Sequence, residues 1–231
     1  MDADSQGHYL EAMGIQRWVV RTDRTGHPTE ETGLADTGTA GPQAVSGWDD
    51  LQAEVMACTR CELHKTRTQA VFGAGNRQAD WLIVGEAPGA DEDRQGEPFV
   101  GRAGQLLTEM LFAAGYPREQ VYIANILKCR PPGNRNPQPH EIASCQDYLW
   151  RQIRLVQPKI ILAVGAIAAN SLLQTDARVG ELRGKIHTMP GQDLPVVVTY
   201  HPAYLLRSPL EKRKVWDDLQ FARKVYSGVV H

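Results

Sequence analysis

Trp81-Leu-Ile-Val-Gly-Glu-Ala-Pro-Gly89 is the stretch of sequence on which the fold prediction rests. Its first four residues form a continuous apolar run that ends at a glycine. This is the pattern of a strand buried on both faces of a parallel sheet. The polar segment 85–89 follows at the point where such a strand ends. Outward from this stretch, strand and helix patterns alternate from Trp48 onward.

The remaining apolar runs predict three more strands, and segments with helical periodicity separate them. Strands are expected at residues 81–84, 121–126, 159–164 and 195–199. Helices are expected at residues 49–60, 103–114, 139–155 and 209–226, with a short one between Gly165 and Leu173. Because parallel strands joined by helices become covered on both faces, this order predicts an α/β fold built on a parallel sheet.

Composition and charge argue against a membrane protein. The chain has 231 residues, 42% of them hydrophobic and 23% charged, and a formal net charge of −2. No apolar stretch approaches the ~20 residues of a membrane-spanning helix, and the N-terminus lacks a signal pattern, so we expect a soluble cytoplasmic protein. Residues 1–47 hold seven acidic and three basic residues, whereas residues 48–231 hold 22 basic and 20 acidic ones. This mild positive balance is compatible with nucleic-acid binding but does not demonstrate it.

Residues 22–47 are rich in Thr, Gly, Ala and Pro and are predicted to form a flexible linker. They separate residues 1–21 from a main domain at residues 48–231. Within the N-terminal segment, residues 9–21 resemble the peptide of the psi subunit of the bacterial clamp loader that docks on the chi subunit. This resemblance implies a docking peptide for a chi-like subunit, anchored by Ile15 and Trp18. A non-functional extension, or a helix packed on the domain, is the alternative.

Four cysteines form the most distinctive constellation of the chain. Cys58 and Cys61 make a C-x-x-C pair, and Cys129 and Cys145 follow far downstream. A two-residue gap lets two thiolates face one metal centre, and four thiolates complete either a zinc site or an iron–sulfur cluster. Two disulfides are the alternative, which is disfavoured because nothing in the chain indicates secretion. The spacing alone leaves zinc and iron–sulfur open.

Three polar motifs follow predicted strands. Residues 85–89 follow the first strand, Asn125 lies near the end of the second, and Tyr200-His-Pro-Ala-Tyr-Leu-Leu-Arg207 follows the fourth. In open α/β sheets, ligands bind beyond the carboxyl ends of the strands. The sequence therefore predicts a site at this edge of the sheet.

Two residues of these motifs are candidates for polar chemistry. Glu86 could position a water molecule or stabilise a cation, although the segment could also be an ordinary turn because it lacks the glycine and lysine pattern of a phosphate loop. Asn125 interrupts an apolar strand, so its amide must be satisfied either by a structural network or by a ligand. A side-chain amide offers both a donor and an acceptor, which can pair with the edge of a pyrimidine.

Other residues suit contacts with a nucleic acid, although each also has a structural explanation. Phe99 is either a core residue or an aromatic that stacks on a base, just before a glycine-containing helix start. His201 could donate a hydrogen bond to an oxygen that gains charge, or simply cap a helix. Leu205 and Leu206, with Arg207 behind them, suit a wedge that enters a base stack while the arginine meets a phosphate.

Taken together, the motifs resemble the family 4 (iron–sulfur) enzymes of the uracil-DNA glycosylase superfamily. They are C-x-x-C, GEAPGADED, PFVGRAGQLL, YIANILKCRPP, the downstream Cys145 and YHPAYLLR, and they span about residues 50–227. The resemblance implies a three-layer α/β/α sandwich around a four-stranded parallel sheet and a 4Fe–4S cluster. It also implies hydrolysis of the N-glycosidic bond of uracil in single- or double-stranded DNA, which leaves an abasic site for base excision repair.

The resemblance also implies a role for each matching residue. Cluster ligands are implied at Cys58, Cys61, Cys129 and Cys145. A uracil pocket is implied at Gly85, Glu86, Ala87, Phe99, Asn125 and His201. Catalytic roles fall to Glu86, which orients water or stabilises the sugar cation, and to His201, which stabilises the uracil anion. Leu205 is the preferred DNA wedge, with Leu206 second and Arg207 beside them.

Two other classes of function remain open at this point. One is a non-catalytic DNA-binding or clamp-loader accessory iron–sulfur protein, and the other is a cluster-based redox sensor. The complete set of Glu86, Phe99, Asn125 and His201 favours an enzyme, which we expect to be monomeric. Related covalent uracil binders carry a K-R-R-I-H insertion where this chain reads ILKCRPPGNRNPQPHE. Its absence predicts turnover rather than trapping of the substrate.

Overall fold

The computed structural model describes residues 47–229. The predicted docking peptide at residues 1–21 lies outside the described residues, as does the predicted linker at residues 22–47 apart from Gly47. Both therefore stay predictions. No helix in the described part of the chain is long and apolar enough to cross a membrane.

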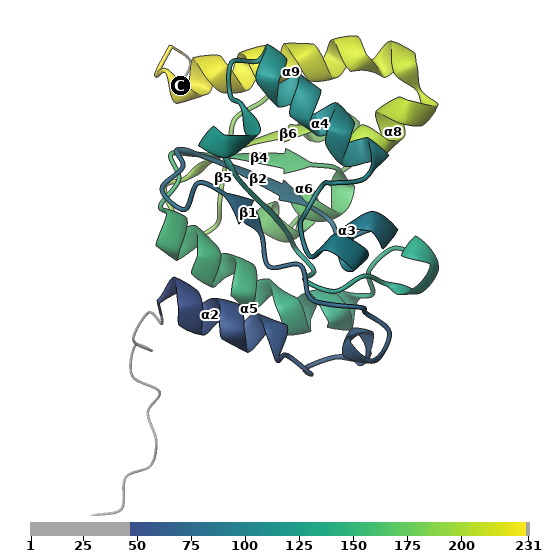
Figure 1. The fold of residues 1–231 in the computed structure, drawn as a ribbon. Coiled ribbons are helices and arrows are strands. Elements are labelled where there is room, and N and C mark those ends of the chain that lie inside the picture. The colour runs from purple at the N-terminus through teal and green to yellow at the C-terminus, as the bar shows by residue number, and fades with distance from the viewer. Residues whose placement is uncertain (1–46, 230–231) are drawn as a thin grey trace, which may run out of the picture. The chain divides into compact units, whose positions relative to one another are not determined.

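A six-stranded sheet forms the middle layer of the domain (Figure 1). Its four central strands are parallel and lie in the order β3 (Tyr122–Asn125), β2 (Trp81–Gly85), β4 (Ile160–Val164) and β6 (Pro195–Thr199). Antiparallel two-residue strands add the edges, β1 (Ala74–Gly75) beside β3 and β5 (His187–Thr188) beside β6. The expected count of four strands is thus wrong for the whole sheet, although four parallel strands make its centre. Strands of two residues are too short to leave a periodic pattern in the sequence.

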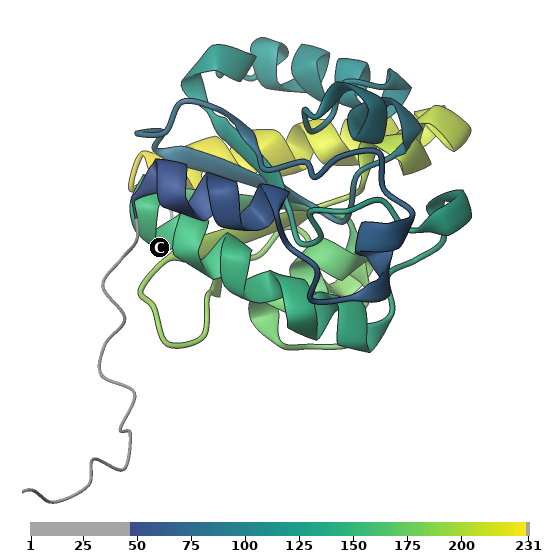
Figure 2. The ribbon, with the colours of Figure 1, turned by 60° about the horizontal axis from the view of Figure 1, so that its bottom comes forward.

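Helices cover both faces of the sheet. Figure 1 shows α4 and α9 on one face and α5 on the other, with α2 outside α5, and Figure 2 shows α2 and α5 side by side from another direction. The described α-helices are α2 (Trp48–Met56), α3 (Ala90–Gln95), α4 (Arg102–Ala113), α5 (Pro139–Val156), α6 (Ala166–Leu173), α7 (Val179–Leu182), α8 (Pro202–Arg207) and α9 (Lys212–Tyr226). Short 3₁₀ turns occupy Glu62–Lys65, Arg118–Gln120, Pro132–Asn134 and Pro209–Glu211.

Burial on both faces of the central strands explains their continuous apolar sequence. Leu82 and Val84 of β2 pack with residues of α5 and α6 in one cluster. Trp81 and Ile83, which alternate with them, pack with residues of α4 and α9 in a second cluster. Because successive side chains of a strand point to opposite faces, each face of β2 needs its own apolar pair. The three-layer arrangement follows from these two cores.

The predicted helix at residues 209–226 begins with a 3₁₀ turn and is α-helical only from Lys212 onward. A separate helix, α8, precedes it and ends at Arg207; the next residue, Ser208, has φ −132° and ψ 71°. A residue before a proline avoids the helical region, so Ser208 cannot continue α8 into Pro209. The Pro209–Glu211 turn then leads into α9. The prediction is correct for α9 and wrong for its first turn.

The carboxyl ends of the central strands meet at one edge of the sheet. Gly85 at the end of β2 lies opposite Asn125 at the end of β3, and Thr199 ends β6 just before the Tyr200–His201 dipeptide. The three polar motifs are therefore neighbours in space, as the strand order predicts.

Candidate active site

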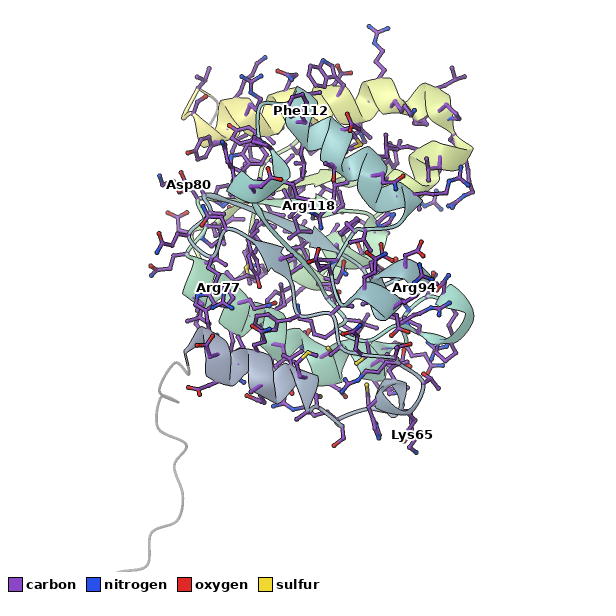
Figure 3. The ribbon with its side chains drawn as sticks, viewed as in Figure 1. Lys65, Arg77, Asp80, Arg94, Phe112 and Arg118 are labelled. Atoms are coloured by element: carbon purple, nitrogen blue, oxygen red, sulfur yellow. The ribbon has the colours of Figure 1, made fainter. Side chains whose placement is uncertain are left out.

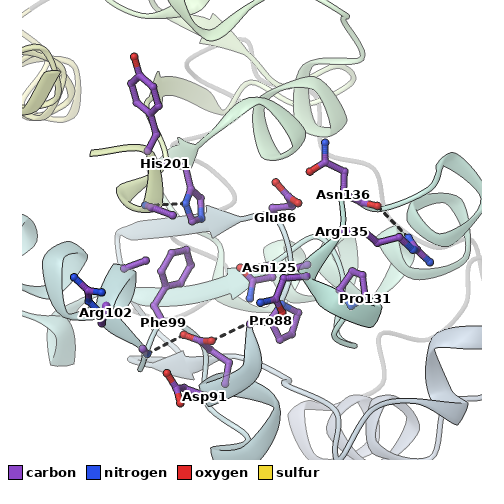
Figure 4. A pocket seen from close by; sticks show the side chains of 18 of the residues that line it. Glu86, Pro88, Asp91, Phe99, Arg102, Asn125, Pro131, Arg135, Asn136 and His201 are labelled. Carbon is purple, nitrogen blue, oxygen red and sulfur yellow. Dashed lines mark hydrogen bonds between the residues drawn. The ribbon is translucent and has the colours of Figure 1, made fainter. Parts of the chain in front are cut away.

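A pocket of about 510 Å³ opens at this edge of the sheet (Figure 4). Of the predicted site residues, it is lined by Glu86, Ala87, Phe99, Asn125, His201 and Arg207. Other parts of the wall come from the turn at residues 88–89, α3, the start of α4, the loop 131–136 and the start of α8. Gly85 lies beneath the pocket, in contact with two of its walls.

Gly85 is the floor on which Phe99 and Asn125 rest. A Cβ atom at this position would lie 2.6 Å from Cε2 of Phe99 and closer still to Oδ1 of Asn125. Such contacts are well inside van der Waals distance, so a larger residue would displace the ring or the amide. Glycine is therefore the residue that leaves room for both side chains at this position.

The aromatic wall comes from Phe99, which is only 7% exposed. Its ring centroid lies 5.7 Å from that of His201, with 32° between the ring planes. Behind it, the backbone of Phe99 packs directly against Gly104 in the first turns of α4, where a Cβ atom would collide with the Phe99 carbonyl. Gly85 therefore lies against the ring, and Gly104 allows the backbone of Phe99 to lie directly against α4.

Asn125 presents an unpaired acceptor to the pocket. The residue is 2% exposed, and its Oδ1 is buried without a hydrogen-bond partner in the described structure. A buried carbonyl oxygen that lacks a donor is unfavourable by about 1–3 kcal/mol. A ligand that brings an N–H group to this point would remove that penalty.

His201 is held as a neutral hydrogen-bond donor. Its Nδ1 accepts the backbone N–H of Ala203 at 3.1 Å and so caps α8. Because that nitrogen accepts, the ring proton must lie on Nε2. Burial is the main cause that lowers the pKa of His201 to about 4. The positive charge of Arg207 also lowers it, and the negative charge of Glu92 opposes this with a smaller effect. Near neutral pH the imidazole therefore offers an uncharged Nε2–H.

Glu86 brings a carboxylate to the same pocket. In the view of Figure 4 it lies between His201 and Asn136. Burial raises its pKa above the ordinary value of 4.5. A carboxylate whose charge is poorly solvated interacts strongly with a nearby water proton or a positive centre.

The family model described as "Uracil DNA glycosylase superfamily" matches residues 72–220, which include all the pocket residues described above. The chain belongs to this superfamily. It is also 44% identical to the type-4 uracil-DNA glycosylase of Archaeoglobus fulgidus over 178 residues, which cover 74% of this chain and 89% of that protein. The type-4 uracil-DNA glycosylase of Thermotoga maritima is 44% identical over 177 residues, covering 75% and 91% of the two chains. This identity places the chain among the type-4 uracil-DNA glycosylases.

A more distant relative helps to define the subfamily. The type-5 uracil-DNA glycosylase of Pyrobaculum aerophilum is 26% identical over 191 residues, covering 69% of this chain and 84% of that protein. The identity to the type-4 proteins is much higher over similar lengths. The type-4 glycosylases are therefore the nearer group.

The four cysteines of this glycosylase line one small cavity, together with Arg67, Lys128 and Tyr148. The first pair lies just beyond α2, because that helix ends at Met56 rather than at the predicted residue 60. All four are free, and no group of three or more His, Cys, Asp or Glu side chains among residues 47–229 is arranged around a single metal ion. N–H groups reach three of the sulfurs: Arg67 Nη1 to Cys129 at 2.9 Å, the Lys128 amide to Cys145 at 3.3 Å and the Arg60 amide to Cys58 at 3.5 Å.

The structure reverses the preference between the two wedge candidates of the glycosylase. Leu205 is fully buried in the core that α4 and α9 share with the sheet. A side chain in that position cannot enter a base stack without leaving the core, so Leu205 is a packing residue here. Leu206 is 39% exposed and next to Arg207, which lines the pocket.

Sequence reasoning missed one wall of the glycosylase pocket, the loop 131–136. Arg135 donates to both oxygens of the buried Glu141, at 2.9 and 2.6 Å. Glu141 in turn accepts the backbone N–H of Gln138 at the start of α5, at 2.8 Å. This pair holds Asn136 at the pocket rim. The Gln138–Glu141 spacing ahead of an apolar helix is a capping pattern that could have indicated an ordered loop.

Proposed function

We propose that this protein is a uracil-DNA glycosylase that hydrolyses the N-glycosidic bond of uracil in DNA and leaves an abasic site. The observation that carries this function is the convergence of Phe99, Asn125 and His201 on one pocket. Each supplies something that uracil can use: an aromatic face, an unpaired acceptor and a neutral N–H donor. The membership of the type-4 family supports the same conclusion.

The recognition step rests on Phe99 and Asn125. A base inside a duplex cannot reach an enclosed pocket, so the nucleotide must leave the stack, which costs a few kcal/mol. Stacking on an aromatic ring returns about 1–3 kcal/mol per base. The unpaired Oδ1 of Asn125 can accept the N3–H of uracil, and its amide N–H₂ can donate to O4.

The bond-breaking step rests on His201. When the bond between C1′ and N1 breaks, its electron pair goes to uracil, and negative charge spreads onto the ring oxygens while the sugar becomes cationic. The Nε2–H of His201 can donate to the oxygen that gains this charge. A positioned donor of this kind contributes about 2.7–4 kcal/mol to transition-state stabilisation.

The hydration step rests on Glu86. Its carboxylate stabilises the sugar cation and orients the water that attacks C1′. The water oxygen forms the new bond to C1′, and one water proton passes to the carboxylate. Glu86 then releases this proton to solvent, and the uracil anion takes up one proton at N1, so that the carboxylate is restored. The products are free uracil and an abasic site, with no covalent link between enzyme and DNA.

We further propose that Cys58, Cys61, Cys129 and Cys145 hold a 4Fe–4S cluster. Four free cysteines line one cavity, and four thiolates are the ligand set of a 4Fe–4S cluster. The N–H groups on three of the sulfurs suit thiolates, which are strong acceptors. The cluster would supply structural cross-linking rather than a step of the hydrolysis. Its cysteines would hold the segment that follows Asn125.

DNA would bind to the surface around the opening of the pocket. Leu206 is exposed next to the site and can act as the wedge, with Arg207 and Arg102 available for phosphates. A cytoplasmic, monomeric enzyme without a membrane partner, and the docking of residues 9–21 on a chi-like clamp-loader subunit, stay predictions.

Strand scission tests the function. Purified full-length protein is incubated with an oligonucleotide that carries one uracil, and abasic sites are then cleaved with alkali. The matched control carries thymine at the same position. Scission at uracil alone is expected. Intact uracil DNA after incubation with iron-loaded protein would contradict the proposal and favour a non-catalytic DNA-binding or accessory protein.

A further inference from the structure

Phe99 has an unusual backbone. Its φ is 55°, in the left-handed region that residues other than glycine seldom adopt. Such a conformation persists only where the surroundings enforce it, and it is often found at binding sites. Removal of whatever enforces it would let the ring leave its place against Gly85.

Glu92 of α3 holds the chain on the C-terminal side of Phe99. Its Oε1 accepts the backbone N–H groups of Val100 at 3.0 Å and Gly101 at 2.9 Å. Its Oε2 accepts the N–H of Gly89 at 3.1 Å. One carboxylate thus joins Gly89, at the end of the loop that follows β2, to the two residues that precede α4.

Arg118 holds the two peptide groups that flank Phe99. Its Nη1 donates to the carbonyl of Phe99 at 3.2 Å, and its Nη2 donates to the carbonyl of Pro98. Figure 3 shows Arg118 beneath α4, on the side of the sheet. A guanidinium presents its donors in a rigid plane, so it can fix two successive peptide groups at once. With Glu92, it fixes the peptide groups on both sides of Phe99.

We propose that Glu92 and Arg118 are positioning residues that hold Phe99 in its left-handed conformation, so that its ring is ready to stack on the flipped base. This inference rests on the proposed function, because uracil is the ligand for which the ring is preset. Neither side chain needs to touch the base. Ordering the ring before binding removes a cost that uracil binding would otherwise bear.

A double-mutant cycle tests this role. Arg118→Met and Glu92→Gln are each made in the wild-type and the Phe99→Ala backgrounds, and Arg223→Met is the control for loss of an exposed arginine. We measure kcat and KM on uracil DNA and inhibition by free uracil. In the wild-type background each variant should weaken uracil inhibition and kcat/KM about tenfold, the scale of one lost stacking contact. Binding to abasic-site DNA, which has no base to stack, should not change.

The cycle separates positioning from a general loss of structure. With Phe99→Ala already present, Arg118→Met and Glu92→Gln should lower kcat/KM by less than about twofold, because residues that act through one group are not additive. Equal losses in both backgrounds would overturn the inference, and so would single variants that match Arg223→Met.

Amide hydrogen exchange gives a readout that does not depend on catalysis. Glu92, not Arg118, binds the amides of Val100 and Gly101. If the two side chains hold one segment, Arg118→Met should still accelerate exchange at both amides, whereas Arg223→Met should not. Unchanged exchange in Arg118→Met would contradict the inference. Wild-type protein that releases no uracil would contradict the proposed function instead, and the exchange result would still decide the role of Arg118.

Discussion

The ring of Phe99 and the imidazole of His201 have centroids 5.7 Å apart and planes at 32°, although the two residues are far apart in the sequence. One precedes α4 and the other begins α8. The ring that we propose stacks on the base and the imidazole that we propose stabilises its developing charge therefore share one wall. Substitution of either residue should impair uracil handling, but at different steps.

His201→Ala should lower kcat by roughly 10²–10³-fold with little change in KM, because the lost donor acts on charge that develops only in the transition state. Single-turnover kinetics on uracil DNA measures this. His187→Ala is the matched control, since His187 lies on the edge strand β5 and bonds the Leu182 carbonyl. Equal kcat values for the two variants would contradict the assigned role.

The pH dependence should be set by Glu86 rather than by His201. The carboxylate must be ionised, and burial raises its pKa above 4.5, so activity should fall as the pH drops through that raised value. His201 becomes protonated only near pH 4, so it adds no loss at its ordinary pKa of 6.5. Glu86→Gln should lower kcat and remove the acidic limb above pH 4. An acidic limb at 6.5 that persists in Glu86→Gln would show that His201 is not held neutral.

Substitution of Leu205 should lower the stability of the fold, whereas substitution of Leu206 should impair the opening of double-stranded DNA. Leu205→Ala should destabilise the fold by about 2–5 kcal/mol, as for other buried leucines, which denaturant unfolding measures. Leu206→Ala should unfold like wild type but lose about tenfold in activity on double-stranded DNA, where a wedge replaces the extruded base. Single strands, which have no duplex to open, should be cleaved as by wild type. The opposite pattern would restore Leu205 as the wedge.

The cysteine cavity should yield a coloured, iron-containing protein. Metal analysis and visible absorbance of anaerobically purified protein are expected to show the 4Fe–4S cluster, and Cys129→Ser should lose both iron and colour. The same variant should weaken uracil inhibition, because Cys129 closely follows Asn125 on one segment. A colourless protein that contains zinc would contradict the cluster assignment.

The sequence predicts most of the central layer of the fold, because buried parallel strands have a distinctive composition. Residues 195–199 are a strand as expected, and the run at 81–84 extends by one residue to Gly85. Elements that are stabilised mainly by contacts with other parts of the chain have no such composition and are not predicted. The six-residue α3 is too short for periodicity, and its cap depends on Glu92 bonding back to Gly89.

The candidate site also contains some residues that the sequence indicates and others that only the structure reveals. Asn125 and His201 stand out in the sequence, because a polar residue within or after an apolar strand needs an explanation. Glu92 and Arg118 do not stand out, because charged residues in a polar stretch are ordinarily solvated. Their importance lies in the backbone groups that they meet, and only the three-dimensional structure shows those contacts.

Release of the free base is the most direct test of the central claim that the pocket takes up uracil and frees it. The iron-loaded protein is incubated with uracil DNA, and free uracil is quantified by mass spectrometry beside abasic sites, for wild type and for Asn125→Ala. We predict one uracil per abasic site over many turnovers, and a loss of kcat/KM of roughly 5- to 150-fold in Asn125→Ala, the range for one or two lost hydrogen bonds. Absence of free uracil, or equal release by both proteins, would contradict the account.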